Sequence, residues 1–233
     1  MSAQTIFVTG TDTGVGKTYV ACALLRQLRA AGHLVCGYKP VASGCVDTPR
    51  GLRNDDALAL QKAAATREPY ECINPYAFEP AIAPHLAARA AGVDVQTARL
   101  DTAHADLAAR YDWVLVEGAG GWQVPLNERD TFADWVAGHD WPVLLVVGMR
   151  LGCINHALLS AESITRRTRL AGWVANALPP QMTELEDNID TLQRRMPAPL
   201  LGVMPADEMM ALDLQPLLSR SREFPGTPDA AES

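Results

Sequence analysis

The chain has 233 residues, a hydrophobic content of 48% and a formal net charge of −7. This length suits one large α/β domain, and the apolar content is sufficient for a continuous core. The acidic charge argues against a nucleic-acid partner or an anionic membrane surface, and because there is no signal-like segment and no apolar run long enough to cross a bilayer, we expect a cytoplasmic protein.

The first predicted elements are a strand, a glycine-rich loop and a helix. Residues 5–9 form a short apolar run with β-branched side chains, which is typical of a buried parallel strand. The following loop contains three glycines, Gly10, Gly14 and Gly16. A helix then opens at Lys17-Thr18 and stops at Gly32. The pattern predicts a phosphate-binding loop, in which Lys17 reaches the β- and γ-phosphates and the Thr18 hydroxyl holds Mg²⁺, over the alternative of an ordinary glycine-rich turn.

A second strand is predicted at 34–38, and the polar segment 41–53 after it is expected to be a surface loop. Lys39 and Ser43 directly follow this strand. A lysine beside the γ-phosphate would stabilise a transferring phosphoryl group and an anionic acceptor. The alternative for Lys39 is a solvated lysine in a loop.

The next segment is expected to be helical and then irregular. Asn54 can cap a helix over 55–65, in which Leu58 and Leu60 would face inward. Residues 66–84 contain four prolines and no clean periodicity. Long ordered connections of this kind are usually functional.

The rest of the chain alternates strands with helices. In chain order we expect a helix at 94–110, a strand at 113–117, a short helix at 131–137, a strand at 142–147, a helix at 154–167, a strand at 170–175, a polar helix at 183–195 and a last strand at 200–204. This alternation predicts a mostly parallel sheet with helices on both faces, in one P-loop NTPase-like domain. The domain would span 1–219, and 220–233 would be a disordered tail.

Several polar segments follow strand ends and should meet on one rim of the sheet, where α/β proteins bind ligands. They are 10–18, 39–44, 117–121, 148–155 and Asn176. Glu117 ends an apolar strand, where P-loop proteins place a carboxylate for Mg²⁺, although a solvated carboxylate is the alternative. Asp56 or its neighbour Asp55 is a second candidate, or simply a favourable charge in a helix first turn. Asp12, an acid in a phosphate loop, should face a cation or a positively charged substrate.

Three further features are less specific. The helix opening at Leu151 to Asn155 could bind a carboxylate through its free N–H groups or be a plain βα turn. Three tryptophans are expected in the core or an interface, namely Trp122, Trp135 and Trp141. The five cysteines are scattered without a Cys-x-x-Cys pair, which favours reduced thiols over disulfides or zinc.

Six motifs together resemble the dethiobiotin synthetase family. They are Gly-Thr-Asp-Thr-Gly-Val-Gly-Lys-Thr (10–18), Gly-Tyr-Lys-Pro-Val-Ala-Ser-Gly (37–44), Gly-Leu-Arg-Asn-Asp-Asp-Ala-Leu (51–58), Val-Glu-Gly-Ala-Gly-Gly-Trp (116–122), Leu-Gly-Cys-Ile-Asn-His-Ala (151–157) and Gly-Trp-Val-Ala-Asn (172–176). The similarity runs in order from about residue 4 to 205. The resemblance implies ATP- and Mg²⁺-dependent carboxylation of 7,8-diaminononanoate with CO₂. The product, dethiobiotin in biotin biosynthesis, would form through a carbamate and a carbamic-phosphoric anhydride, with release of ADP and phosphate.

The resemblance also assigns roles by position. Lys39, Lys17 and Thr13 would be catalytic, and Thr18, Asp56 and Glu117 would hold Mg²⁺. Residues that would contact ATP are Gly14, Val15, Gly16, Lys17, Thr18, Tyr19, Asp56, Glu117, Gly118, Ala119, Gly120, Asn176, Pro205, Ala206 and Asp207, with Asn176 reading the adenine edge. Residues that would bind the diamine or its carbamate are Thr13, Ser43, Leu151, Gly152 and Asn155. The helix start at Leu151 would act across a subunit interface, which implies a homodimer with the active site at the interface.

Two other activities compete with this hypothesis. A related ATP-dependent amide-forming ligase would be expected to carry a glutamine-hydrolysing domain with its own cysteine nucleophile, for which 233 residues leave no room. A nucleotide-driven switch of the partitioning-ATPase type would carry a lysine where this chain has Asp12. Phosphate release that depends on the diamine would separate the synthetase from the switch.

Overall fold

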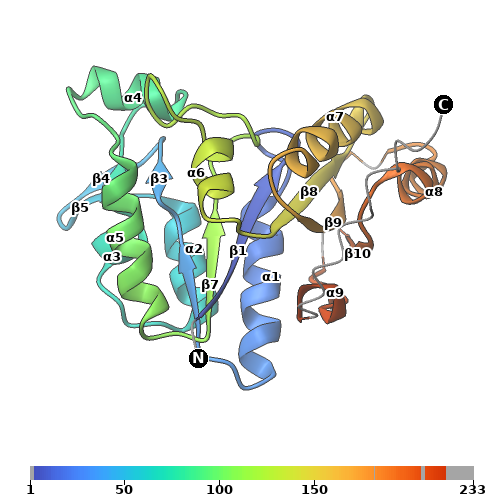
Figure 1. The fold of residues 1–233 in the computed structure, drawn as a ribbon, viewed down its shortest axis with the longest axis horizontal. Helices are drawn as coiled ribbons and strands as arrows, with labels where there is room; N and C mark the ends of the chain where they lie inside the picture. Colours follow the sequence, from blue (N-terminus) through green and yellow to red (C-terminus); the bar gives the residue numbers. More distant parts are fainter. Residues whose placement is uncertain (1–2, 181, 206–207, 219–233) are drawn as a thin grey trace, which may run out of the picture.

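A six-stranded parallel sheet forms the centre of the computed structural model, which describes residues 3–180, 182–205 and 208–218 (Figure 1). The strand order is β10-β9-β8-β1-β7-β2, and every neighbouring pair is parallel. The strands are β1 (Gln4–Gly10), β2 (Val35–Tyr38), β7 (Trp113–Glu117), β8 (Val143–Met149), β9 (Leu170–Ala177) and β10 (Leu200–Met204). The predicted α/β class with a parallel sheet is therefore confirmed.

Helices cover both faces of this sheet, as the alternation of elements predicts (Figure 1). One face packs against α1 (Lys17–Ala30), α2 (Asp55–Ala64) and α9 (Gln215–Leu218). The other packs against α5 (Thr97–Ala108), α6 (Phe132–Gly138), α7 (Cys153–Thr165) and α8 (Leu185–Arg195). Two apolar cores result, one on each side of the sheet.

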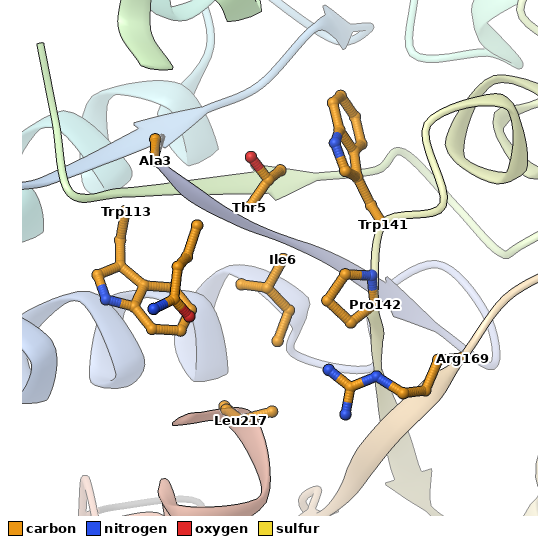
Figure 2. Close-up of a pocket in the computed structure, with 9 residues that line it drawn as sticks. Ala3, Thr5, Ile6, Trp113, Trp141, Pro142, Arg169 and Leu217 are labelled. Carbon is orange, nitrogen blue, oxygen red and sulfur yellow. The ribbon is translucent and has the colours of Figure 1, made fainter. Parts of the chain in front are cut away.

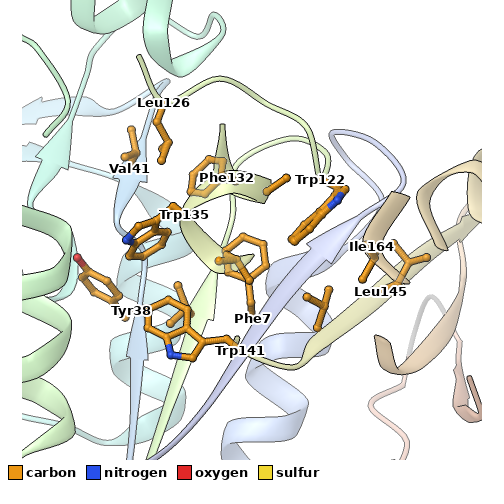
Figure 3. Packing of buried hydrophobic residues seen from close by; sticks show 14 of the residues in the cluster. Phe7, Tyr38, Val41, Trp122, Leu126, Phe132, Trp135, Trp141, Leu145 and Ile164 are labelled. Carbon is orange, nitrogen blue, oxygen red and sulfur yellow. The ribbon is translucent and has the colours of Figure 1, made fainter. Parts of the chain in front are cut away.

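The apolar strands divide their side chains between the two cores, since successive residues of a strand point to opposite faces. In β1, Phe7 faces the core under α6, whereas Ile6 and Val8 face α1. Phe7 packs against the rings of Trp122 and Phe132, with centroids 6.0 and 5.8 Å away (Figure 3). The expectation that Trp122, Trp135 and Trp141 are core residues is met, because their exposed fractions are 3%, 5% and 8%.

The segment between β2 and β7 is more structured than the sequence indicates. Residues 41–53, expected to be a surface loop, contain the buried strand β3 (Val41–Ala42) and a hairpin of β4 (Val46–Thr48) with β5 (Gly51–Arg53). Residues 66–84, expected to be irregular, contain α3 (Tyr70–Ile73) and β6 (Tyr76–Ala77), which pairs in parallel with β3. A short helix, α4 (Pro84–Ala90), follows. Strands of two residues carry too little periodicity to be predicted from sequence.

Three smaller expectations are corrected. Leu58 is 40% exposed, because Leu60 and Ala63 form the inward face of α2. The helix expected at 94–110 begins at Thr97, and the one expected at 183–195 begins at Leu185. The expected tail, 220–233, lies outside the described residues.

Two expectations from composition can be examined in the structure. All five cysteines are free, and all but Cys72 are buried. Across the described ranges, no helix has both the length and the apolar character that a bilayer span requires.

Candidate active site

A cavity of about 740 Å³ opens at the carboxyl ends of β1, β2 and β7. It is lined by Thr13, Gly14, Gly16, Lys17, Thr18, Tyr19, Lys39, Ala42, Ser43, Asn54, Asp56, Ala81, Ile82, Ala83, Pro84, Ala119, Gly120 and Val124. Residues from five separate stretches of sequence therefore meet at one rim. The long connection 66–84 contributes the apolar residues at 81–84 to the wall.

The glycine-rich loop has the conformation that phosphate binding requires. Gly14 and Gly16 have φ values of +71° and +87°, in the left-handed region that favours glycine. No side chain caps α1, and no acidic residue lies in its first turn, so the free N–H groups and the positive end of the helix dipole face the cavity. A phosphate group is the ligand that such a helix terminus suits best.

Lys17, the first residue of α1, is largely buried beside this loop. Its ammonium donates a hydrogen bond to the Asp12 carbonyl oxygen at 2.9 Å. Burial, with a smaller contribution from the nearby charge of Lys39, lowers the Lys17 pKa from 10.5 to about 8. The carboxylates of Glu117, Asp56 and Asp12 offset part of this lowering. A bound phosphate would favour the charged form of Lys17 in the same way.

Lys39 lies between two carboxylates at the end of β2. Its Nζ atom is 2.6 Å from Glu117 Oε1 and 3.0 Å from Asp56 Oδ2, and it also donates to the Gly118 carbonyl at 3.2 Å. Burial alone would lower the Lys39 pKa, but the charges of Glu117 and Asp56 more than offset burial and raise it. Burial would likewise raise the Asp56 pKa, and the Lys39 ammonium more than offsets it and lowers the pKa. Lys39 is 3% exposed, so it is not a solvated loop lysine.

The oxygens around this lysine also fit a divalent cation. Glu117 is fully buried, and its Oε1 accepts from Lys39 and from the Thr18 hydroxyl at 2.9 Å. Its second oxygen, Oε2, is buried and has no hydrogen-bond partner. A hydroxyl and two carboxylates (Thr18, Asp56 and Glu117) are the hard oxygen donors that Mg²⁺ takes alongside phosphate and water. Among the described residues no three His, Cys, Asp or Glu side chains form a metal cluster.

Asn176, at the end of β9, contacts the phosphate loop from the opposite side. Its Nδ2 donates to the Val15 carbonyl at 2.8 Å, and a Cβ atom on Gly16 would lie only 2.1 Å from that nitrogen. The Asn176 Oδ1 is buried and unpaired. It could accept a hydrogen bond from an amino group, such as the one on adenine.

Asp12 faces a cation from its own chain, which is one of the two partners expected for it. Its Oδ2 pairs with Arg150 Nη2 at 2.5 Å, and its Oδ1 accepts from the Thr13 amide. Leu151, Gly152 and Asn155 are exposed and do not line the cavity. Leu151, the most exposed of them, has 96% of its surface free.

The remaining candidate residues differ in where they lie relative to the cavity. Glu117 and Gly118 contact Lys39 just beneath the cavity, whereas Val15 is buried in the core. Pro205 is half-buried after β10, and Ala206 and Asp207 lie outside the described residues. Three buried polar residues have contacts that the sequence does not indicate, namely Asn54, Tyr70 and Asn74. Only the helix-cap pattern at Asn54 offered a signal.

A second hollow, of about 240 Å³, lies at the opposite end of the sheet (Figure 2). It is bordered by the start of β1, by Trp113, Trp141 and Arg169, and by Leu217 of α9 (Figure 2). It has no glycine-rich loop and no carboxylate among its lining residues. Of these two hollows, the first therefore combines the glycine-rich loop with lysines and a carboxylate.

Comparisons with known proteins agree with this location. A family model described as an AAA domain matches residues 4–211. The ATP-dependent dethiobiotin synthetase BioD of Pseudomonas paraeruginosa (strain DSM 24068 / PA7) is 56% identical over 220 residues, which cover 91% of this chain and 96% of that protein. The ATP-dependent dethiobiotin synthetase BioD 1 of Escherichia coli (strain K12) is 50% identical over 200 residues, covering 85% and 89%.

Solved structures give the fold alone. The septum site-determining protein MinD complexed with Mg-ADP from Pyrococcus horikoshii OT3 superposes with a TM-score of 0.54 at 15% identity. The match covers 88% of this chain and 82% of that one. At this identity the likeness supports a P-loop NTPase-like architecture and nothing about the reaction.

Proposed function

The chain belongs to the ATP-dependent dethiobiotin synthetase family, and we propose that it carboxylates 7,8-diaminononanoate with CO₂ and closes the ureido ring of dethiobiotin. It is an ATP-dependent ligase of biotin biosynthesis. The observation that carries the finer proposal is the meeting of Lys17, Lys39 and Glu117 beside one cavity at the phosphate loop. Two amines and CO₂ become a cyclic urea only if an oxygen is activated as a leaving group, and ATP supplies that activation.

The proposed reaction has three steps. One amine of the substrate attacks the carbon of CO₂ and loses a proton, which gives a carbamate. A carbamate oxygen attacks the γ-phosphorus of ATP and displaces ADP, which gives a carbamic-phosphoric anhydride. The second amine then attacks the carbamoyl carbon, loses a proton and expels phosphate as the ring closes.

Lys39 and Lys17 would provide the positive charge for these steps. Lys17, beside the phosphate loop, would bind the β- and γ-phosphates. Lys39, whose Nζ shares Glu117 Oε1 with the Thr18 hydroxyl, would neutralise the carbamate and the γ-phosphate as charge moves between them. Fixed charges that are themselves buried, as Lys17 and Lys39 are, stabilise such a transition state more strongly than they would in solution. Thr13 and Ser43, which also line the cavity, would contact the diamine or its carbamate.

We propose that Thr18, Asp56 and Glu117 hold Mg²⁺. The support is the buried, unpaired Oε2 of Glu117, together with the hydroxyl and the second carboxylate beside it. The ion would neutralise charge on the ATP phosphates. Nucleotide contacts are proposed for residues 14–19, Glu117 to Gly120 and the stretch 205–207.

The unpaired Asn176 Oδ1 supports adenine over guanine. Adenine presents an amino group that could donate to this oxygen, whereas guanine presents a carbonyl at the same ring position, which would repel it.

We further propose a homodimer in the cytoplasm. Leu151, Gly152 and Asn155 lie outside the cavity of their own chain and are exposed, so they could bind a substrate carboxylate only at the cavity of a second copy. A side chain as apolar and exposed as Leu151 would favour burial in such an interface. The cytoplasmic location follows from the proposed consumption of ATP.

The test is phosphate release from ATP with Mg²⁺ and bicarbonate, measured with and without 7,8-diaminononanoate, and with mass spectrometry of the product. We expect release that depends on the diamine, and dethiobiotin as the product. ATP hydrolysis that is indifferent to the diamine would refute the proposal and favour a nucleotide-driven switch.

A further inference from the structure

A buried polar chain links the backbone of Lys39 to the start of α2, where Asp56 lies. The Asn74 Nδ2 donates to the Lys39 carbonyl oxygen at 2.7 Å and to the Tyr76 carbonyl at 3.0 Å. The Tyr70 hydroxyl donates to Asn74 Oδ1 at 2.9 Å and accepts from the Asn54 amide at 2.7 Å. These bonds cross between three segments that are separate in the sequence.

Asn54 extends this hydrogen-bond network to the start of α2 and to the backbone of Ser43. Its Oδ1 accepts from the Ala57 amide at 3.2 Å and so caps α2, two residues from Asp56. Its Nδ2 lies 3.5 Å from the carbonyl oxygen of Ser43. The Tyr70 hydroxyl therefore links Asn74, which hydrogen-bonds the Lys39 carbonyl, with Asn54, which caps the helix that carries Asp56.

This hydrogen-bond network is buried, and each of the side-chain atoms described above has a partner, so the network is rigid. Asn74 is 3% exposed, and Asn54 and Tyr70 are each 8% exposed. The Arg53 guanidinium lies over the Tyr70 ring, 4.2 Å from its centroid. Buried polar networks in which every member is satisfied fix one arrangement of the groups they join, because each broken bond leaves an unpaired polar atom.

We propose that Tyr70 and Asn74 are positioning residues, which hold the Lys39 ammonium in register with Asp56 for the phosphoryl transfer. This inference rests on the proposed function, in which Lys39 neutralises the reacting groups. Neither residue contacts the cavity, and neither touches the phosphate loop. Their loss should therefore reduce turnover and leave nucleotide binding almost intact, since small displacements of a reacting group cost rate more than affinity.

Tyr70→Phe tests the proposal, with Tyr38→Phe as its matched control. Tyr38 is fully buried and directly precedes Lys39, but its hydroxyl donates to the Leu100 carbonyl at 3.0 Å, outside the network of Asn54, Tyr70 and Asn74. Both variants lose one buried hydroxyl and should lower the melting temperature, Tyr70→Phe somewhat more because its hydroxyl makes two hydrogen bonds and that of Tyr38 makes one. Only Tyr70→Phe should lower kcat, by about tenfold, with the KM for ATP nearly unchanged. Asn74→Ala should show the same separation of kcat from KM.

Hydrogen exchange of the Asn54 and Lys39 amides gives a second measurement that needs no turnover. Exchange at both should be faster in Tyr70→Phe than in the wild type and unchanged in Tyr38→Phe. The proposal is overturned if kcat falls equally in both tyrosine variants, or if the Lys39 amide exchanges as in the wild type. A wild-type protein that makes no dethiobiotin would refute the proposed function instead, and the exchange result would still decide whether the network holds Lys39.

Discussion

Replacing Lys39 by methionine should separate its structural role from its chemical one. Methionine keeps an unbranched stem and removes the ammonium that lies 2.6 Å from Glu117 and 3.0 Å from Asp56. Glu117 is fully buried and would keep only the Thr18 hydroxyl as partner. Breaking a buried ion pair by removing one member costs about 3–5 kcal/mol, because the other charge stays buried. In a chain of this size that corresponds to a melting temperature lower by roughly 10 °C.

Turnover should fall much further than nucleotide affinity. Loss of one fixed charge aimed at the transition state lowers kcat by about 10²- to 10³-fold. The glycine-rich loop and Lys17 remain, so a fluorescent ATP analogue should bind almost as it does to the wild type. Mg²⁺ should raise the melting temperature of Lys39→Met more than that of the wild type, because two carboxylates then lack a cation.

The control is Lys62→Met, which removes the same charge from the exposed last turn of α2. It should change the free energy of unfolding by no more than about 0.5 kcal/mol and leave kcat unchanged. A Lys39→Met variant with wild-type kcat would refute the chemical role of Lys39. An unchanged melting temperature would refute the claim that its ammonium holds the two carboxylates together.

Three further predictions concern other parts of the molecule. Gly16→Ala should lower affinity for the ATP analogue at least about tenfold, because φ is +87° and the new Cβ would lie 2.1 Å from Asn176 Nδ2. Gly32→Ala is the control for backbone strain, because φ there is +92° but a Cβ would meet no atom within 4 Å. This control variant should bind the ATP analogue normally. Burial, with a smaller contribution from the neighbouring His139, lowers the His104 pKa from 6.5 to about 4. Between pH 6.5 and 4, His104 is therefore protonated in the unfolded chain but not in the folded one. The wild type should lose about 2 kcal/mol between pH 6.5 and 4, allowing for solvent screening, and denaturant titrations of His104→Gln should show a correspondingly smaller loss; an equal loss would contradict the assignment. Leu151→Arg should give a monomer in light scattering with reduced diamine-dependent turnover and normal ATP binding, whereas an unchanged active dimer would exclude Leu151 from the interface.

The sequence predicts the sheet and the phosphate loop well because both depend on short-range patterns. Continuous apolar runs such as 113–116 need burial on both faces, and a covered parallel sheet provides it. The spacing of Gly14, Gly16 and Lys17 is likewise local, since the loop conformation and the helix start depend on adjacent residues.

The polar contacts of the site could not be predicted in the same way. Tyr70 and Asn74 lie in a proline-rich stretch with no periodicity, and their partners at Asn54 and Lys39 are 16 and 35 residues away. Arg150 pairs with Asp12 across 138 residues, so the sequence could not decide between a cation of the protein and a positively charged substrate as the partner of Asp12. Side-chain pairing over such separations depends on the tertiary fold, and one sequence contains no direct signal of it.

The segment between β2 and β7 forms a large part of the wall of this cavity. The glycine-rich loop, α1 and the carboxylate at the end of β7 form a general device for binding nucleotide phosphates. The other wall of the cavity comes from residues 39–84, with Lys39 and Ser43 at one end and the apolar stretch 81–84 at the other. A charged group beside a phosphate site, followed by an apolar surface, suits a substrate with reacting amines and an aliphatic chain. Because α3, β3 and β6 hold this wall in place, changes there should alter the choice of substrate before they alter the binding of ATP.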